Sequence, residues 1–336
     1  MKSFLALAEL CREEVVDLLD LASRLERRPE PEALKGRILA LLFFNPSLRT
    51  LASFQAGMAR LGGSSFVIAP GQGTWLLETR DGVVMDGAAA EHVREAIPVL
   101  AGYADALGIR SFAGGTDLAA DLADSTFRSM AAVCPVPLLN LESAIDHPCQ
   151  ALADWKTMDD LRVPARGGRF VLTWAWHPKP LPLAVPAAAV HMAALRGMEV
   201  TVLRPEGFGL PEAVLEKARA AAAASGGSVR ETADHEDALA GAHVIYAKSW
   251  TAPSCYGDAE SEASLRAGLR DWCVDDDWFA AAAPDCRFMH CLPVRRNVVV
   301  KDSVLDGPRS VVIHEARNRM WAQMAVLHRL LGRNER

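Results

Sequence analysis

Short apolar runs alternate with helical segments along the chain, and this alternation constrains the fold more than any other feature. Residues 37–44 form a continuous apolar run after a leading arginine, which is typical of a strand buried on both faces. A helix is expected next, because apolar residues recur at helical spacing from Leu51 to Leu61 and Gly62 follows as a stop signal. Strands that alternate with helices in this way predict parallel sheets with helices on both faces.

The alternation occurs in two series, which predict an α/β protein with two doubly wound parallel-sheet domains. Further strands of the first series are expected at 65–69, 106–111 and 136–140, and those of the second at 169–174, 199–203, 243–247, 288–291 and 311–313. Helices are expected at 9–25, 91–100, 187–195, 211–224, 235–240 and 318–331. We place the first domain at residues 1–145 and the second at 146–316, and we expect the helical segment 317–336 to pack back on the first domain.

Charge and cysteine content exclude several classes of protein. The chain has 36 Lys and Arg against 42 Asp and Glu, a net charge of −6, whereas a general nucleic-acid binder needs a basic face. An apolar run of about 18 residues, which a membrane span requires, is absent. The cysteines number seven and form no C-x-x-C pair, so we expect reduced thiols in a cytoplasmic protein.

The segment Ser47-Leu48-Arg49-Thr50 follows the first buried strand and begins a helix. Backbone N–H groups and the helix dipole make such a point an anion site. Ser47 and Thr50 add hydroxyl groups, and Arg49 adds a permanent charge. The alternative interpretation is an ordinary helix N-cap with Arg49 in solvent.

Two further segments carry histidine and cysteine next to proline. They are His147-Pro148-Cys149-Gln150 and His290-Cys291-Leu292-Pro293. A neutral imidazole N–H of His147 is suited to polarising a carbonyl group, and the carbonyl of Leu292 is available to a ligand N–H because proline follows. A buried structural histidine and a Cys/His nucleophilic site are the alternatives. The spacings are not those of a zinc site, so no metal is expected.

The ends of other strands carry weaker signals. Lys248 follows one apolar strand and is suited to meeting a carboxylate, although an exposed lysine is an equal alternative. Trp75 lies in a Gly-rich loop, as a core residue or as one that reaches into a neighbouring subunit. His177 precedes a Pro-rich loop at the carboxyl end of another strand, where ligands bind in open α/β sheets. The absence of Gly-x-Gly-x-x-Gly counts against a dinucleotide cofactor.

Taken together and in this order, the three motifs resemble the carbamoyl-phosphate motifs of the aspartate/ornithine carbamoyltransferase family over essentially the whole chain. The segments 84–87, 174–180 and 246–250 resemble the branch that acts on N-acylated ornithine. Leu48 stands where ornithine enzymes usually have Thr, and the Ser-Met-Gly loop of those enzymes is replaced by Thr251-Ala252-Pro253-Ser254.

The resemblance implies transfer of a carbamoyl group from carbamoyl phosphate to the side-chain amine of an N-acyl-L-ornithine in arginine biosynthesis, with no metal or redox cofactor. It implies a group of residues that bind carbamoyl phosphate and stabilise the transition state: Ser47, Arg49, Thr50, Arg110, His147, Gln150, Cys291, Leu292 and Arg319. Within this group Gln150 and the carbonyl of Leu292 would orient the carbamoyl NH₂.

For the second substrate we select Lys248 for its carboxylate, and Glu142 and His177 for its polar groups. The resemblance also implies a homotrimer with shared active sites, in which Trp75 comes from the adjacent subunit, and a knotted second domain that includes the Pro-rich loop. Knots are exceptions to the usual chain topology.

The acyl group is the open part of this interpretation. Ala90 precedes Glu91-His92, where acetyl-specific members tend to have Glu and succinyl-specific members Pro. A small residue leaves room for a longer acyl group, so we favour N-succinyl-L-ornithine, followed by N-acetyl-L-ornithine and then ornithine. The alternatives of another class are a non-catalytic carbamoyl-phosphate-binding paralogue and a Cys/His hydrolase.

Overall fold

A computed structural model describes residues 1–332, and the chain divides into two compact units. Unit 1 comprises residues 1–114, 119–149 and 319 onward, and unit 2 comprises 115–118 and 150–318. Helices α6 (Pro148–Asp160) and α12 (Val312–Leu331) each contribute residues to both units. Each unit is described by itself below.

Unit 1 is built on a four-stranded parallel sheet in the order β2-β1-β5-β6. Its strands are β1 (Ile38–Phe43), β2 (Ser64–Ile68), β5 (Ala106–Arg110) and β6 (Leu138–Glu142), and a separate two-stranded sheet contains β3 (Leu76–Glu78) and β4 (Ala89–His92). Its helices are η1 (Leu7–Glu9), α1 (Arg12–Arg27), α2 (Leu48–Arg60), α3 (Val93–Ala101), most of α4 (Leu118–Leu122), and α5 (Ser125–Ala132).

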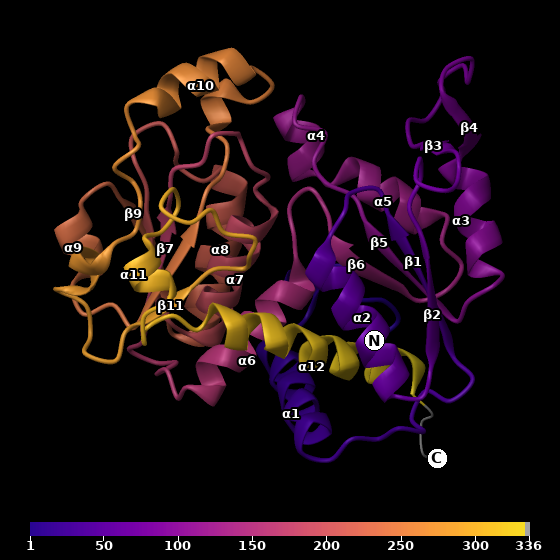
Figure 1. The fold of residues 1–336 in the computed structure, drawn as a ribbon, viewed down its shortest axis with the longest axis horizontal. Helices are drawn as coiled ribbons and strands as arrows, with labels where there is room; N and C mark the ends of the chain where they lie inside the picture. Colours follow the sequence, from indigo (N-terminus) through magenta and orange to yellow (C-terminus); the bar gives the residue numbers. More distant parts are fainter. Residues whose placement is uncertain (333–336) are drawn as a thin grey trace. The chain divides into compact units, whose positions relative to one another are not determined.

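Apolar side chains of the sheet and its helices form the core of unit 1. Leu42, Leu107 and Ile109 on the strands pack with Ile97 of α3 and Phe127 of α5. On α2, Gly57 allows close packing of α12, because a Cβ there would lie 3.1 Å from a side-chain atom of Met324. The end of α12 is therefore part of this unit, as Figure 1 shows beside α2.

Unit 2 contains a five-stranded parallel sheet in the order β11-β10-β7-β8-β9. The strands are β7 (Arg169–Trp174), β8 (Glu199–Leu203), β9 (Ser228–Thr232), β10 (Val244–Lys248) and β11 (Arg287–Met289). The helices are α7 (Ala184–Arg196), α8 (Glu212–Ser225), α9 (His235–Leu239), η2 (Pro253–Cys255), α10 (Ala259–Ala267), η3 (Asp276–Phe279) and α11 (Asp302–Leu305), with parts of α6 and α12.

Each sheet reverses its strand order at one point. In unit 1 the chain passes from β1 outward to β2 and then returns to β5 on the other side of β1. In unit 2 it passes from β7 outward through β8 and β9 and returns to β10 on the other side of β7. The carboxyl ends of the strands at such a reversal are where open α/β sheets bind ligands.

The α/β class with parallel sheets is as predicted, but the strand expected at 311–313 is wrong. Val311 donates a backbone hydrogen bond to the Phe288 carbonyl, and its own carbonyl then accepts from the Glu315 N–H as α12 begins. Val311 and Val312 are buried as the helix begins, whereas Ile313 is exposed, so the packing of the helix start overrides the strand propensity of these residues. The short edge strand β9, the β3–β4 sheet and helix α10 were not predicted from the sequence.

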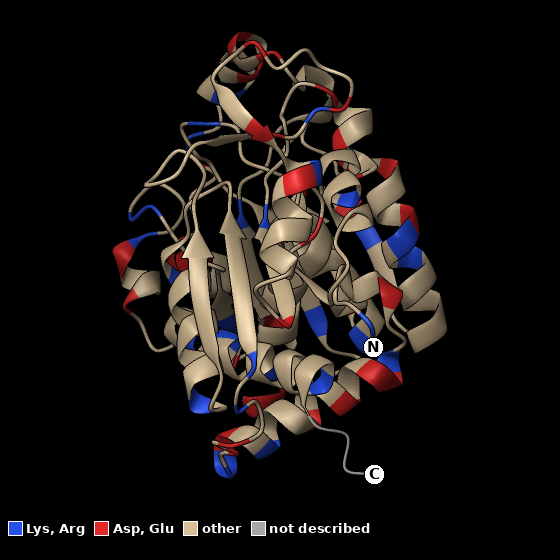
Figure 2. Ribbon diagram, turned by 90° about the vertical axis from the view of Figure 1, so that its right-hand side faces the viewer, with Lys and Arg blue, Asp and Glu red and all other residues tan. Residues whose placement is uncertain are grey.

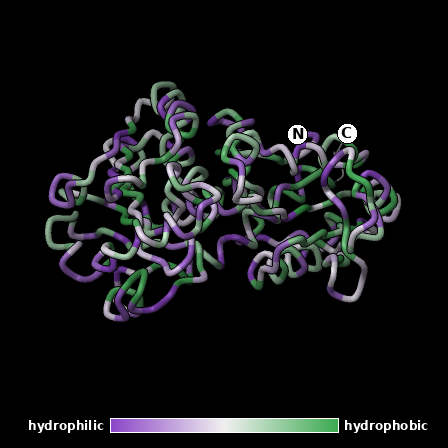
Figure 3. Tube along the Cα trace, turned by 90° about the horizontal axis from the view of Figure 1, so that it is seen from above, coloured by the Kyte–Doolittle hydropathy of each residue, from purple (hydrophilic) through white to green (hydrophobic). Residues whose placement is uncertain are grey.

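The distribution of polarity agrees with two packed units. Hydrophobic segments are concentrated inside each unit in Figure 3, and hydrophilic segments occupy many of the outer loops. Basic and acidic residues are interspersed along the ribbon in Figure 2. Within residues 1–332, no helix has the length and apolar character needed to cross a membrane.

Candidate active site

The first group of polar side chains lies at the start of α2, directly after β1. Ser47 is the N-cap, and its Oγ accepts a 3.2 Å hydrogen bond from the Thr50 N–H and donates at 2.9 Å to Thr50 Oγ1. Arg319, from α12, donates through Nη2 to the same hydroxyl oxygen at 2.6 Å. Thr50 is fully buried, and its hydroxyl is held by two partners at the positive end of the helix.

Arg110 ends β5, on the other side of the strand reversal. It is the register partner of Phe43 in β1 and of Glu142 in β6. Its Nη1 donates to the Glu142 carboxylate, and the same carboxylate oxygen lies 3.4 Å from His147 Nε2. All three polar side chains are buried, so the carboxylate fixes an arginine and a histidine at the carboxyl end of the sheet.

The electrostatic balance of this group is positive. Burial lowers the pKa of Arg319 from its usual high value, and the charges of Arg110 and Arg49 lower it further, while Cys149 and Glu142 oppose the change. Three guanidinium groups therefore interact around one carboxylate and one helix N-terminus. This arrangement favours a compact anion that carries more than one negative charge.

The second group lies in unit 2, at its strand reversal. Lys248 at the end of β10 is the register partner of Trp174 at the end of β7. His177 follows β7, and its Nε2 accepts a 3.1 Å hydrogen bond from Arg295 Nε. The other ring nitrogen, Nδ1, lies 2.8 Å from the Lys179 carbonyl and 3.1 Å from the Lys179 N–H. Burial, then the charges of Arg295 and Lys248, lower the pKa of His177, so the ring is neutral.

A third group, also in unit 2, surrounds the start of α6. The side-chain nitrogen of Gln150 donates to Asp154 at 2.8 Å and to Glu315 at 3.0 Å. Glu315 also accepts a 2.9 Å hydrogen bond from the His290 N–H, next to the buried Cys291. Leu292 adopts a left-handed backbone with φ 54°, a conformation that is unusual for leucine and concentrated at functional sites.

The remaining predicted residues are Trp75 and Ala90, at the β3–β4 sheet, and Leu48 on α2. Trp75 is 57% exposed, and its indole N–H donates a 2.8 Å hydrogen bond to Glu91. Ala90 is exposed on β4 next to that glutamate. Leu48, on the first turn of α2, is 79% exposed. These apolar side chains are available to a large ligand or to another protein surface.

The structure therefore brings most predicted residues into groups. Ser47, Arg49, Thr50, Arg110, Glu142, His147 and Arg319 gather in unit 1, whereas Gln150, His177, Lys248, Cys291 and Leu292 belong to unit 2. Glu142 was selected for the second substrate, but its contacts are with Arg110 and His147 in unit 1.

Three functional candidates were missed, Asp154, Arg295 and Glu315, and His290 lies in a predicted motif but was given no role of its own. Asp154 follows Gln150 by four residues on one helix, a spacing that places two side chains on the same face. Glu315 was given no role, yet it is fully buried. No comparable signal marks Arg295.

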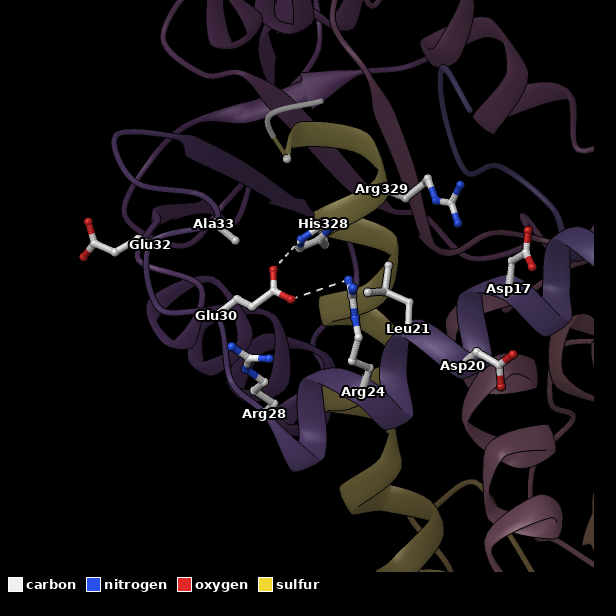
Figure 4. Close-up of a pocket in the computed structure, with 11 residues that line it drawn as sticks. Asp17, Asp20, Leu21, Arg24, Arg28, Glu30, Glu32, Ala33, His328 and Arg329 are labelled. Carbon is white, nitrogen blue, oxygen red and sulfur yellow. Dashed lines mark hydrogen bonds and ion pairs between the residues drawn. The ribbon is translucent and has the colours of Figure 1, made fainter. Parts of the chain in front are cut away.

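A large pocket in unit 1 lies away from these groups. Its volume is about 1130 Å³, and Figure 4 shows it between α1, the segment after α1 and the end of α12. Glu30 there pairs with His328 at 2.9 Å and with Arg24 at 3.5 Å. Its lining mixes acidic and basic side chains and includes none of the predicted site residues, so it does not offer the single sign of charge that a dianion needs.

Two observations on the described residues bear on metal binding and on the thiol of Cys149. Within 1–332, no three His, Cys, Asp or Glu side chains are grouped so as to hold a metal ion. Burial raises the pKa of Cys149 to about 12, so its thiol stays protonated at neutral pH. A protonated thiol is a weak nucleophile, which disfavours a hydrolase based on that residue.

The sequence matches known proteins along its length. It matches the aspartate/ornithine carbamoyltransferase carbamoyl-P binding domain over residues 2–160 and the Asp/Orn binding domain of the same family over 185–330. It is 40% identical over 337 residues to the N-acetylornithine carbamoyltransferase of Xanthomonas campestris pv. campestris, covering 99% of both chains. It is 37% identical over 298 residues to the N-succinylornithine carbamoyltransferase of Bacteroides thetaiotaomicron, covering 88% of both.

One solved structure adds information on ligands. It is an N-acetyl-L-ornithine transcarbamylase mutant, with glutamate replaced by alanine, complexed with carbamyl phosphate and N-succinyl-L-norvaline. That chain is 40% identical to this one and matches it with a TM-score of 0.94, covering 98% of this chain and 100% of that chain.

Proposed function

The chain belongs to the aspartate/ornithine carbamoyltransferase family and to its N-acylornithine branch, and from this premise we propose that it carbamoylates N-succinyl-L-ornithine. The side-chain amine attacks the carbonyl carbon of carbamoyl phosphate, forming a C–N bond. The C–O bond to phosphate then breaks, the attacking nitrogen loses a proton, and the products are N-succinyl-L-citrulline and phosphate.

The observation that carries this proposal is the cationic group at the strand reversal of unit 1. Carbamoyl phosphate is a small dianion, and the N-terminus of α2 supplies N–H groups beside the hydroxyls of Ser47 and Thr50. Arg49, Arg110 and Arg319 supply permanent positive charge. This combination of a helix N-terminus and guanidinium groups is suited to a phosphate group.

The transition state carries negative charge on the former carbonyl oxygen. We assign Thr50, Arg110 and His147 as donors to that oxygen, because all three are buried and held by protein partners before substrate binds. Donors that are already oriented cost no reorganisation during the reaction. Removal of one such donor typically costs about 2.7–4 kcal/mol, or roughly 10²–10³ in rate.

The attacking amine must lose its proton before it reacts. A free alkyl amine has a pKa of about 10.4, so only about one molecule in 10³ is neutral at pH 7. In unit 2, burial and the charges of Arg295 and Lys248 already lower the pKa of His177. The same environment disfavours an ammonium group, so it favours the neutral, nucleophilic amine.

The acyl group is the finer part of the proposal. N-Succinyl-L-ornithine has two carboxylates, and unit 2 has the two cations Lys248 and Arg295 next to His177. Ala90 is small where acetyl-specific members tend to have glutamate, and a glutamate-to-alanine mutant of an acetyl enzyme was crystallised with N-succinyl-L-norvaline. The 40% identity to an N-acetylornithine carbamoyltransferase favours N-acetyl-L-ornithine as the second candidate.

A side-by-side assay tests both levels of the proposal. The purified chain is expected to convert N-succinyl-L-ornithine with the highest kcat/KM, N-acetyl-L-ornithine with a lower value, and ornithine hardly at all. Ala90→Glu is expected to shift the preference towards the acetyl substrate, while Ala88→Glu on the same exposed segment serves as the control. Higher kcat/KM with N-acetyl-L-ornithine in the wild type would refute the acyl assignment. Binding of carbamoyl phosphate without turnover of any amine would favour a non-catalytic paralogue.

The domain roles, the assembly and the cellular setting are further parts of the proposal. We assign carbamoyl phosphate to the first domain and the acylated amine to the second, in a cytoplasmic homotrimer that acts in arginine biosynthesis. Exposed Trp75, Leu76, Val84 and Met85 near the β3–β4 sheet support a subunit contact there. A knot in the second domain also remains a prediction. Light scattering of the full chain tests the trimer.

A further inference from the structure

Glu315 is a fully buried carboxyl group with partners on three separate segments of unit 2, one of them the Tyr246 hydroxyl of β10, which lies 3.5 Å from Oε1. Its Oε1 accepts a 3.0 Å hydrogen bond from the side-chain nitrogen of Gln150. Its Oε2 accepts a 2.9 Å hydrogen bond from the His290 backbone N–H. One side chain thus contacts both motifs that are assigned to the carbamoyl NH₂.

The contacts of Gln150 fix which way its amide faces. The nitrogen donates to Asp154 Oδ1 at 2.8 Å as well as to Glu315. The opposite orientation would set the amide oxygen against an oxygen of each carboxyl group, and a pair that shares one proton could donate to it at one of these two contacts at most. The Oε1 atom of Gln150 is buried and has no hydrogen-bond partner among residues 1–332. Because a buried acceptor without a partner is costly, this oxygen is suited to a ligand N–H.

The second segment is fixed in a similar way. His290 is held by its N–H bond to Glu315, and its Nδ1 accepts a 2.9 Å hydrogen bond from the Leu292 N–H. Leu292 has a left-handed φ of 54°, and such a conformation in leucine persists only where neighbours enforce it. The direction of the Leu292 carbonyl therefore depends on a chain of contacts that begins at Glu315.

Burial of two carboxyl groups in contact has a consequence for their charge. Burial raises the pKa of Glu315 well above its ordinary range, and the neighbouring Asp154 raises it further. Two carboxyl groups that share one proton avoid the repulsion of two buried negative charges. One carboxyl group of the pair is therefore neutral and the other is charged, and each accepts a hydrogen bond from the side-chain nitrogen of Gln150.

We propose that Glu315, together with Asp154, is a positioning residue that aims the Gln150 side-chain oxygen and the Leu292 carbonyl at the carbamoyl NH₂. The proposal rests on the proposed function of these motifs. It predicts a preference for phosphate compounds with a terminal amide over matched compounds in which a methyl group replaces the NH₂. A site that loses one of its buried acceptor contacts loses this discrimination.

Two stable analogues measure this preference without turnover. Phosphonoacetamide carries the amide NH₂, and acetonylphosphonate carries a methyl group in its place. Calorimetry on the full chain is expected to show tighter binding of the amide analogue. In Glu315→Gln the new NH₂ group opposes either the Gln150 NH₂ or the His290 N–H. The ratio of the acetonylphosphonate Kd to the phosphonoacetamide Kd is therefore expected to fall about ten- to hundredfold. Inorganic phosphate, which has neither group, is expected to bind both proteins alike.

A matched control separates positioning from general loosening of the helices. Asp160 also links α6 to α12, through hydrogen bonds from His314 and Asn318, but it does not contact Gln150. Asp160→Asn is expected to keep the wild-type ratio of Kd values. If Glu315→Gln does not fold, Asp154→Leu removes one of the two acceptors of Gln150 and is expected to reduce the same ratio.

The outcomes distinguish this inference from the proposed function. A folded Glu315→Gln or Asp154→Leu protein with the wild-type ratio would overturn the positioning role, even if the wild type carbamoylates N-acylornithines. A wild type that prefers phosphonoacetamide but makes no product from any N-acylornithine would overturn the proposed function. Loss of that preference in Glu315→Gln would still support the positioning role. Equal loss of the ratio in Asp160→Asn would also overturn the inference, because the effect would then be a general one.

Discussion

Arg319 donates a 2.6 Å hydrogen bond to the Thr50 hydroxyl although 269 positions separate the two residues in the chain. The Ser47 hydroxyl also donates to that oxygen, at 2.9 Å. The last helix and the first phosphate motif are therefore joined at one atom in unit 1. An arginine that packs back from the C-terminal helix both adds charge and orients a donor at the N-terminus of α2.

Thr50→Val is expected to lower kcat by about 10²–10³, the usual effect of removing one donor to a developing oxyanion. The substitution preserves shape but leaves Arg319 and Ser47 without their shared acceptor. Steady-state kinetics with carbamoyl phosphate and the preferred N-acylornithine measure the effect. Thr50→Ser keeps the hydroxyl and is the control, so an equally impaired Thr50→Ser protein would contradict the role of the hydroxyl.

Glu142 either contacts the second substrate, as first selected, or acts through Arg110 and His147. Glu142→Gln is expected to distinguish these two roles. The carboxylate contacts Arg110 and His147 in unit 1, so loss of its charge makes the group more positive. Inorganic phosphate should then bind more tightly, as calorimetry would measure. The unfolding free energy should fall by about 3 kcal/mol, because a buried arginine loses its charged partner.

The kinetic signature of Glu142→Gln distinguishes these assignments further. If Glu142 contacts the second substrate, as first selected, the main effect will be a higher KM for N-acylornithine with unchanged phosphate affinity. If it acts through Arg110 and His147, kcat falls and phosphate affinity rises. Arg37 and Asp105 form an exposed pair in the same unit, and Asp105→Asn there provides a control for a simple change of net charge.

A histidine on α7 is expected to make stability depend on pH. Burial, and then the charge of Lys217, lower the pKa of His191 to about 4. The unfolded state has a pKa of about 6.5 and so binds more protons between pH 6.5 and 4. The free energy of unfolding therefore does not suffer from His191 above pH 6.5. As the pH drops towards 4, protonation of His191 in the unfolded state lowers this free energy by up to about 3 kcal/mol.

Urea unfolding of wild type and His191→Gln across this range measures that contribution. The difference between the two curves is needed, because burial raises the pKa of Asp146 to about 7. A raised carboxyl pKa has the opposite sign, so its contribution is present below pH 4 and is lost as the pH rises towards 7. A constant difference between wild type and His191→Gln from pH 4 to 7 would show that His191 does not titrate as described.

The sequence predicted the parts of the fold that have a local signal. Residues 169–174 contain the apolar run Phe170-Val171-Leu172 and form β7 with the predicted bounds. Strand β9 was missed because it is an edge strand with exposed polar residues, which resembles a loop in one sequence. Residues 311–313 were assigned to a strand because their side chains are β-branched, but the contacts of Val311 start a helix.

The same distinction applies to the candidate site. Ser47 was identifiable because the N-cap position after a buried strand has its own chemical pattern, and it caps α2. Glu315 was not identifiable, because a glutamate between a valine-rich segment and an arginine gives no sign that it is buried. Its role depends on contacts with Gln150 and His290 that come from distant parts of the sequence.

The last prediction concerns a buried arginine in unit 2. Arg266 pairs with Glu262, donates to the Trp250 carbonyl at 2.7 Å and to Ser249 Oγ at 3.0 Å, and its guanidinium lies 5.4 Å from the Trp174 ring centroid. These contacts join the ends of β7 and β10 at the strand reversal. Arg266 therefore fixes the backbone next to Lys248 without being a ligand itself.

Arg266→Lys is expected to raise KM for N-acylornithine by about tenfold, equivalent to about 1.4 kcal/mol, because lysine keeps the charge but loses the planar set of donors. Inorganic phosphate should bind as in the wild type, since the cationic group of unit 1 is unchanged. Arg270→Lys is the control, because Arg270 is placed 4.6 Å over the Trp176 ring by a cation–π contact. If Arg266→Lys weakens phosphate binding as much as it raises KM, the effect of the substitution is a general loss of structure. The assignment of Lys248 to the second substrate would then lose this support.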